Sequence, residues 1–232
     1  MSKKYPLIYC AIDTNDLQRA KDLTAQIAPV TGGIKLGLEF FNRFGPQGVE
    51  SVMETAPDAS YFLDLKFHDI PNTVAGAVRV ISENLNPAYL NVHASGGQAM
   101  MEAAKAACAS TTKLIAVTIL TSLDDNDIKA IGYANTTGAQ VKQLAALTQK
   151  AGLAGVVCSS HEIEALRESC GADFTLMVPG IRPAGADQTD QKRTMTPNQA
   201  LKLGATHLVI GRPITAAPNP AEAAADILGS LS

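Results

Sequence analysis

Several features that mark other classes of protein are missing from this 232-residue sequence. No basic run exceeds two residues and the net charge is −3, which argues against a nucleic-acid surface. No stretch approaches the roughly 18 apolar residues of a membrane-spanning helix. The apolar stretch near the start is too short for the hydrophobic region of a signal peptide. Together these absences predict a protein of the cytoplasm that binds neither membrane nor nucleic acid.

Cysteine is also scarce and follows no ligand spacing. The chain has four cysteines, at positions 10, 108, 158 and 170, and none forms a C-x-x-C pair. Buried free thiols are the simplest interpretation, and no metal site is predicted. No G-x-G-x-x-G follows the first predicted strand, and no Walker A sequence occurs. The composition, 46% hydrophobic and 18% charged, is that of a chain with a sizeable core.

Eight short β-rich stretches alternate with longer helical ones. The predicted strands are residues 6–13, 32–37, 60–67, 88–94, 113–120, 155–159, 174–180 and 207–211. One strand and one helix every roughly 25–30 residues is typical of parallel βα repeats. We therefore predict an α/β fold, a single (β/α)8 TIM barrel domain over residues 1–232. An open, doubly wound sheet is the alternative.

Helix boundaries carry their own signals. The first helix is expected over residues 16–27, with Asp16 or Asn15 as its N-cap. Another is expected to begin at Pro71, since proline suits the first turn. Further helices are expected over about residues 38–56, 96–108, 139–152, 161–170 and 220–231. Gly152 is expected to stop the helix over residues 139–152.

Polar residues gather where the predicted strands end. In a barrel these ends meet at one mouth, where chemistry is found. One such residue would mean little, but nearly every strand contributes, which indicates a shared polar pocket. The residues are Asp13, Lys35, Asp64, Lys66, Asn91, His93, Thr118, Thr121, Ser122, Arg182, Gly211 and Arg212.

The stretch FLDLKFHDIPNT places charges inside a strand that begins as a buried one. Asp64 and Lys66 are two residues apart and should share a face, with Leu63, Leu65 and Phe67 on the other. Lys35, on the neighbouring strand, should face the same cavity. Buried charges of opposite sign satisfy one another but add little net stability, so a functional role is favoured. An ion pair that merely fills the barrel mouth is the alternative.

A phosphate site is predicted after the last strand. VIGRPI places Gly211 and Arg212 at a helix N-terminus, where free N–H groups and a guanidinium attract anions. Arg182 and Gln191 lie on the irregular stretch 180–196, and loops of that length are often functional. An ordinary turn with a solvated arginine is the alternative.

The decamer DLKFHDIPNT resembles the signature of the orotidine 5′-phosphate decarboxylase family. Further matching motifs follow in the expected order, so the resemblance covers about residues 7–220. They are AID, IKLGLEFF, NVHASGG, LIAVTILTS, GVVCSSHE, VPGIRP and VIGRPIT. The family converts orotidine 5′-phosphate (OMP) to UMP and CO2, the last step of de novo UMP biosynthesis. The resemblance implies a (β/α)8 barrel, a homodimer with shared active sites, and no metal or organic cofactor.

The resemblance also implies roles for individual residues. Lys66 would protonate C6 of the pyrimidine, Asp64 would lie near the substrate carboxylate, and Lys35 would complete an alternating charge network. Asp69 would enter the partner subunit's site. The remaining implied contacts are Ile70 and Thr73 beside Asp69, Asp13 at the ribose, Thr121 at the base, and Arg182, Gln191, Gly211 and Arg212 at the phosphate or closing loop.

These residues suit the chemistry. Loss of CO2 from C6 leaves a carbanion with little resonance relief, and a fixed ammonium group can stabilise and then protonate it. His68 and His93 are interpreted as structural residues, or as residues that support the site without contacting the substrate, because lysine already fills the donor role. Two other functions stay open: a Mg²⁺-dependent sugar-phosphate lyase or decarboxylase on the same barrel, and a non-catalytic protein that binds a phosphorylated ligand.

Overall fold

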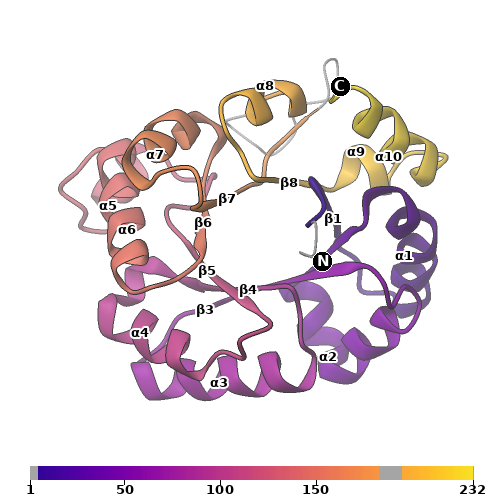
Figure 1. The fold of residues 1–232 in the computed structure, drawn as a ribbon, viewed down its shortest axis with the longest axis horizontal. Helices are drawn as coiled ribbons and strands as arrows, with labels where there is room; N and C mark the ends of the chain where they lie inside the picture. Colours follow the sequence, from indigo (N-terminus) through magenta and orange to yellow (C-terminus); the bar gives the residue numbers. More distant parts are fainter. Residues whose placement is uncertain (1–4, 183–194, 232) are drawn as a thin grey trace.

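The computed structural model describes residues 5–182 and 195–231. Eight parallel strands pair in chain order, and the last pairs with the first, so the sheet closes into a barrel. Helices surround the barrel on the outside (Figure 1). The predicted (β/α)8 barrel is confirmed, and the open doubly wound sheet is excluded.

Each strand lies within its predicted range, because strands buried on both faces leave a continuous apolar signal in the sequence. The strands are β1 Ile8–Ile12, β2 Gly33–Gly37, β3 Ser60–Phe67, β4 Tyr89–His93, β5 Lys113–Val117, β6 Gly155–Val157, β7 Thr175–Val178 and β8 His207–Ile210.

The helices agree less closely with the prediction. They are α1 Leu17–Thr31, α2 Leu38–Met53, α3 Pro71–Asn84, α4 Gln98–Ala107, α5 Asp125–Ala130, α6 Thr137–Lys150, α7 Ile163–Cys170, α8 Pro197–Lys202, α9 Arg212–Thr215 and α10 Pro220–Gly229. Short 3-10 turns, η1 Ala94–Gly96 and η2 Ser160–Glu162, precede α4 and α7. The helices α5 and α8 were not predicted.

Local chemistry explains where α1 begins and ends. The Asp16 side chain accepts a hydrogen bond from the Arg19 N–H (3.0 Å), so Asp16 is the predicted N-cap. The prediction that α1 stops at residue 27 was wrong, since the helix continues to Thr31. It ends at Gly32, whose left-handed backbone (φ 70°) lets its N–H bond to the Ala28 carbonyl.

Aromatic side chains and a histidine fill the barrel interior toward the amino-terminal ends of the strands. Tyr9, Phe62 and Tyr89 are fully or almost fully buried, and their rings meet edge to face. His207 Nε2 lies 2.9 Å from the Tyr89 hydroxyl, and His207 Nδ1 lies 2.7 Å from the Pro6 carbonyl oxygen. This cluster closes the amino-terminal end of the interior.

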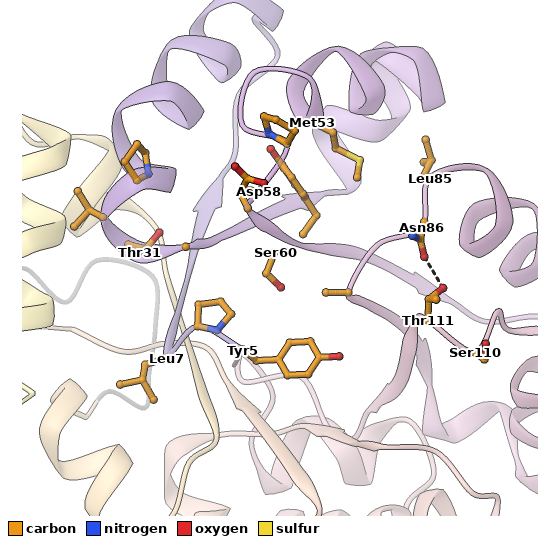
Figure 2. Close-up of a pocket in the computed structure, with 18 residues that line it drawn as sticks. Tyr5, Leu7, Thr31, Met53, Asp58, Ser60, Leu85, Asn86, Ser110 and Thr111 are labelled. Atoms are coloured by element: carbon orange, nitrogen blue, oxygen red, sulfur yellow. Dashed lines mark hydrogen bonds between the residues drawn. The ribbon is translucent and has the colours of Figure 1, made fainter. Parts of the chain in front are cut away.

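A cavity of about 960 Å³ opens at that same end (Figure 2). Its lining comes from residues at or just before the starts of β1 to β5, such as Tyr5, Thr31, Ser60, Asn86 and Thr111. The cavity therefore lies opposite the strand ends where the polar residues gather.

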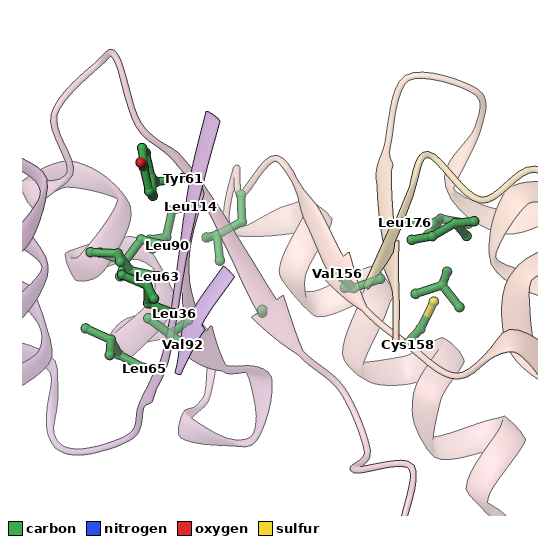
Figure 3. Close-up of a cluster of buried hydrophobic side chains, with 14 of the residues drawn as sticks. Leu36, Tyr61, Leu63, Leu65, Leu90, Val92, Leu114, Val156, Cys158 and Leu176 are labelled. Atoms are coloured by element: carbon green, nitrogen blue, oxygen red, sulfur yellow. The ribbon is translucent and has the colours of Figure 1, made fainter. Parts of the chain in front are cut away.

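The main core lies between the strands and the helices (Figure 3). On β3, Tyr61, Leu63 and Leu65 join this core, whereas Phe62 joins the interior cluster. The predicted outward direction of Leu63 and Leu65 is confirmed. Full burial of one such leucine contributes about 1.5–3 kcal/mol, so the outer face of β3 anchors the strand that carries Asp64 and Lys66.

Candidate active site

A chain of alternating charges lies at the carboxyl-terminal mouth of the barrel. Lys35 Nζ lies 2.9 Å from Asp13 Oδ1 and 3.6 Å from Asp64 Oδ2. The other oxygen of Asp64, Oδ1, lies 2.6 Å from Lys66 Nζ. Three strands supply these four side chains: Asp13 follows β1, Lys35 lies on β2, and the other two lie on β3. The predicted meeting of Lys35, Asp64 and Lys66 is present in the structure.

The middle of this network is the most buried part. The Lys35 and Asp64 side chains are only 8% and 15% exposed. Burial alone would lower the pKa of Lys35, but the carboxylates of Asp64 and Asp13 outweigh it and hold that pKa above its usual value. Burial would likewise raise the pKa of Asp64, but Lys35, Lys66 and a hydrogen bond from Asn91 hold it below its usual value. Both groups are therefore charged at neutral pH.

Glycine at position 37 makes room for the network. A Cβ atom there would lie 3.1 Å from Lys35 Nζ, which is tighter than ordinary packing, and 3.4 Å from Asp13 Oδ1. Gly37 ends β2 and is the N-cap of α2. The absence of a side chain at this turn lets the lysine and the carboxylate meet directly above it.

The backbone at Lys66 departs from a regular strand. Its φ is +50°, in the left-handed region that residues with side chains seldom adopt. The pairing register between β3 and β4 also shifts between Leu63 and Phe67. Regular alternation of side chains along a strand predicts the contact between Asp64 and Lys66 correctly. The strand is nevertheless irregular at Lys66, and this irregularity also sets the direction of the Lys66 side chain.

Asn91 on β4 holds this irregular segment, a role that the sequence prediction did not assign. Its Nδ2 donates to Asp64 Oδ1 (2.7 Å), and its Oδ1 accepts from the Lys66 backbone N–H (2.8 Å). The side chain is fully buried. The available signal was a polar residue inside an otherwise apolar strand.

The two histidines beside the network lie close together. The His68 and His93 ring centroids are 5.5 Å apart. Burial, and then the neighbouring His68 and Lys66, lower the pKa of His93. The lowered pKa favours the neutral form of His93 at physiological pH.

The molecular surface next to β3 carries three of the predicted residues: Asp69 and Ile70, which precede α3, and Thr73 in the first turn of α3. Ile70 is 66% exposed, and Asp69 Oδ1 accepts the Ile70 N–H (2.6 Å). Among the described residues, the ion pairs of the mouth do not include Asp69. Within one chain, Asp69 is thus separate from the network that Asp13, Lys35, Asp64 and Lys66 form.

The predicted anion-binding residues follow two neighbouring strands. Arg182 comes after β7 and is anchored by its backbone N–H, which donates to the Met195 carbonyl (3.1 Å). Gly211 comes after β8, and Arg212 begins α9. Because β7 and β8 are paired, both arginines belong to the same side of the mouth.

The other predicted contacts are less defined. Thr121 lies in a partly exposed turn after β5. Gln191 lies outside the described residues. Within residues 5–182 and 195–231, no three His, Cys, Asp or Glu side chains gather into a possible metal site. No helix in those ranges is long and apolar enough to cross a membrane.

The fold and the charge network define a class: (β/α)8 barrel enzymes with their polar site at the carboxyl-terminal mouth. Residues 6–227 match the model of the orotidine 5′-phosphate decarboxylase / HUMPS family. The chain belongs to this family.

Individual relatives agree over nearly the full length. The orotidine 5′-phosphate decarboxylase of Rhodospirillum rubrum is 52% identical, with 97% of this chain and 93% of that protein covered. That of Teredinibacter turnerae is 46% identical, with both chains covered completely. The crystal structure of the enzyme from Lactobacillus acidophilus superposes with a TM-score of 0.85 at 32% identity, covering 99% of this chain and 100% of that chain.

Proposed function

We propose that the mouth network is the catalytic centre of an orotidine 5′-phosphate decarboxylase, a carboxy-lyase that converts OMP to UMP and CO2. The observation that carries this proposal is the unbroken Asp13–Lys35–Asp64–Lys66 chain of charges, in a member of the decarboxylase family. This reaction is the last step of de novo UMP biosynthesis. Its free nucleotide substrate and product suit a cytoplasmic enzyme.

The reaction breaks the bond between C6 and the carboxylate. CO2 departs, the bonding electron pair stays on C6, and the Lys66 ammonium supplies the proton that completes UMP. The Lys66 side chain contacts Asp64 and is still 26% exposed, so a ligand can reach it. A preorganised ammonium also stabilises the developing carbanion before the proton moves. No organic cofactor or metal is required in this scheme.

Asp64 and Lys35 hold that ammonium in place. Asp64 contacts both lysines. The direction of the Lys66 side chain therefore depends on a carboxylate whose other oxygen is held by Lys35. Asp64 also faces the substrate carboxylate in this scheme, and that repulsion is relieved as CO2 leaves. Asp13, which is 58% exposed, binds the ribose hydroxyls.

The phosphate binds away from C6. Arg182 and Arg212 follow neighbouring strands, and Gly211 precedes the first turn of α9, so guanidinium and backbone N–H groups meet there. Gln191, which lies outside the described residues, is a further phosphate contact in this scheme, and Thr121 contacts the base. Although the phosphate lies far from C6, its binding energy can contribute to catalysis by excluding water from the site.

A homodimer completes each site. Asp69, Ile70 and Thr73 are exposed on one segment beside the mouth, and Ile70 presents an apolar side chain that a partner would cover. In the proposed assembly Asp69 enters the site of the partner subunit and joins that subunit's Lys66 and Asp64.

The proposal is tested by ultraviolet-monitored turnover of OMP by the purified protein in excess EDTA. We expect rapid conversion to UMP without added metal. Turnover of a sugar phosphate that requires added Mg²⁺, with none of OMP, would instead identify the metal-dependent lyase. Nucleotide binding without any turnover would identify a binding protein.

A further inference from the structure

Asn91 is bonded to both members of the lysine–carboxylate pair. Its Nδ2 donates to Asp64 Oδ1, the same oxygen that contacts Lys66 Nζ, while its Oδ1 accepts from the Lys66 backbone N–H. We propose that Asn91 is a positioning residue that aims the Lys66 ammonium at the reacting atom. The inference rests on the proposed function and adds to it a residue that acts through Lys66 and Asp64.

The backbone at Lys66 needs such a support. A left-handed conformation is unfavourable for a residue with a side chain, and it persists only where the surroundings enforce it. The strand register shifts between Leu63 and Phe67, and inside this interval the Asn91 amide oxygen takes the Lys66 N–H. The side-chain amide therefore stands in for a partner that a regular ladder would supply.

The chemistry of the amide fixes its own orientation. A carboxylate only accepts hydrogen bonds, so the NH2 group must point at Asp64 and the oxygen at the Lys66 N–H. One rigid side chain thus sets the distance between a carboxylate on β3 and the backbone of a lysine two residues later. Neither a small nor an apolar side chain can make both contacts.

Replacing the amide by a carboxylic acid gives a signature that a merely structural role would not produce. In Asn91→Asp the oxygen facing Lys66 N–H is retained, but the other oxygen meets Asp64 where Nδ2 lay 2.7 Å away. Two carboxylates at that separation cannot both ionise, so the pKa of the new acid rises. Its protonated form donates to Asp64 as the amide does, and activity should therefore return as the pH falls.

The experiment measures kcat, KM and the Kd of UMP for wild type, Asn91→Asp and Asn91→Ala between pH 6 and pH 8. Losing a hydrogen bond to a charged group corresponds to about a 10- to 100-fold fall in kcat for Asn91→Ala, with KM and UMP binding changed less than about threefold. Asn91→Asp should be impaired similarly at pH 8 and recover about tenfold, relative to wild type, at pH 6. Thr148→Val is the control, because it removes a fully buried hydroxyl on α6 and should leave kcat unchanged.

Asn91→Asp carries the test even if Asn91→Ala fails to fold, because it preserves the side-chain volume. Wild-type kcat in Asn91→Asp at pH 8 would overturn the inference. So would a rise in KM with kcat unchanged, which would make Asn91 a substrate-binding residue. Absence of OMP turnover in the wild type would refute the proposed function instead, so the two failures are distinguishable.

Discussion

Removing the charge of Asp64 should lower both the stability of the folded protein and its catalytic rate. At an effective dielectric constant of about 20, unit charges 2.6 Å and 3.6 Å apart attract by about 6 and about 5 kcal/mol. Desolvation opposes most of this gain, yet removing one partner of a buried pair costs about 3–5 kcal/mol. Here Lys66 would lose the carboxylate it contacts, and Lys35 would keep only its contact with Asp13. We expect Asp64→Asn to lose about 3–5 kcal/mol of unfolding free energy at pH 7. Its kcat should fall about 10²–10³-fold.

The assay is urea denaturation at several pH values together with steady-state turnover. The folded-state pKa of Asp64 lies below its ordinary 3.8, so its stabilisation is present above about pH 4 and is lost as pH falls through the folded pKa. The difference in unfolding free energy between wild type and Asp64→Asn should therefore become smaller at acidic pH.

Two further variants make the Asp64 prediction specific. Lys35→Met combined with Asp64→Asn should regain stability relative to Asp64→Asn alone, since the buried ammonium is gone. Asp58→Asn, at an exposed carboxylate by the opposite end of the barrel, should stay within about 0.5 kcal/mol of wild type. A loss under about 1 kcal/mol in Asp64→Asn, or no recovery in the double variant, would refute the reasoning.

Three other predictions concern other parts of the chain. Burial lowers the pKa of His207 to about 4 from 6.5, so protonation of the unfolded chain should remove up to about 3 kcal/mol of stability as pH falls from 7 to 4. The unfolding free energy of His207→Gln should therefore fall less than that of wild type over this pH range. If urea denaturation gave the same pH dependence of unfolding free energy for both proteins, the prediction would be contradicted. Arg212→Ala should raise KM for OMP at least about tenfold with a smaller change in kcat, and an unchanged KM would remove Arg212 from the phosphate site. Mixed dimers of Lys66→Ala and Asp69→Ala chains should regain activity through one intact site, whereas verified heterodimers without activity would argue against shared sites.

The barrel itself could be predicted from the sequence, because every strand is an apolar stretch between helical stretches and its signal is local. The short helices α5 and α8 were not predicted, although the sequence contains their capping residues. The helix α8 begins with a capping box in which the Thr196 and Gln199 side chains bond to each other's backbone, and Asp124 and Asp127 do the same at α5. Each capping box spans only four residues, and the residues around it have the composition of a loop, so the helix is hard to recognise from sequence.

The candidate site could be predicted in part. The grouping of Lys35, Asp64 and Lys66 follows from strand ends that share one mouth. The left-handed Lys66 backbone and the double contact of Asn91 could not be foreseen, because both depend on a register shift between two strands. Strand alternation carries no information about where such a shift occurs.

In the proposed mechanism, the Lys66 ammonium supplies the proton to C6. The most direct measurement is the kcat of Lys66→Ala on OMP, with the Kd of UMP and the urea midpoint determined on the same preparation. We predict that decarboxylation is abolished while the protein stays folded and binds UMP. Decarboxylation at the wild-type rate in this variant would contradict the claim.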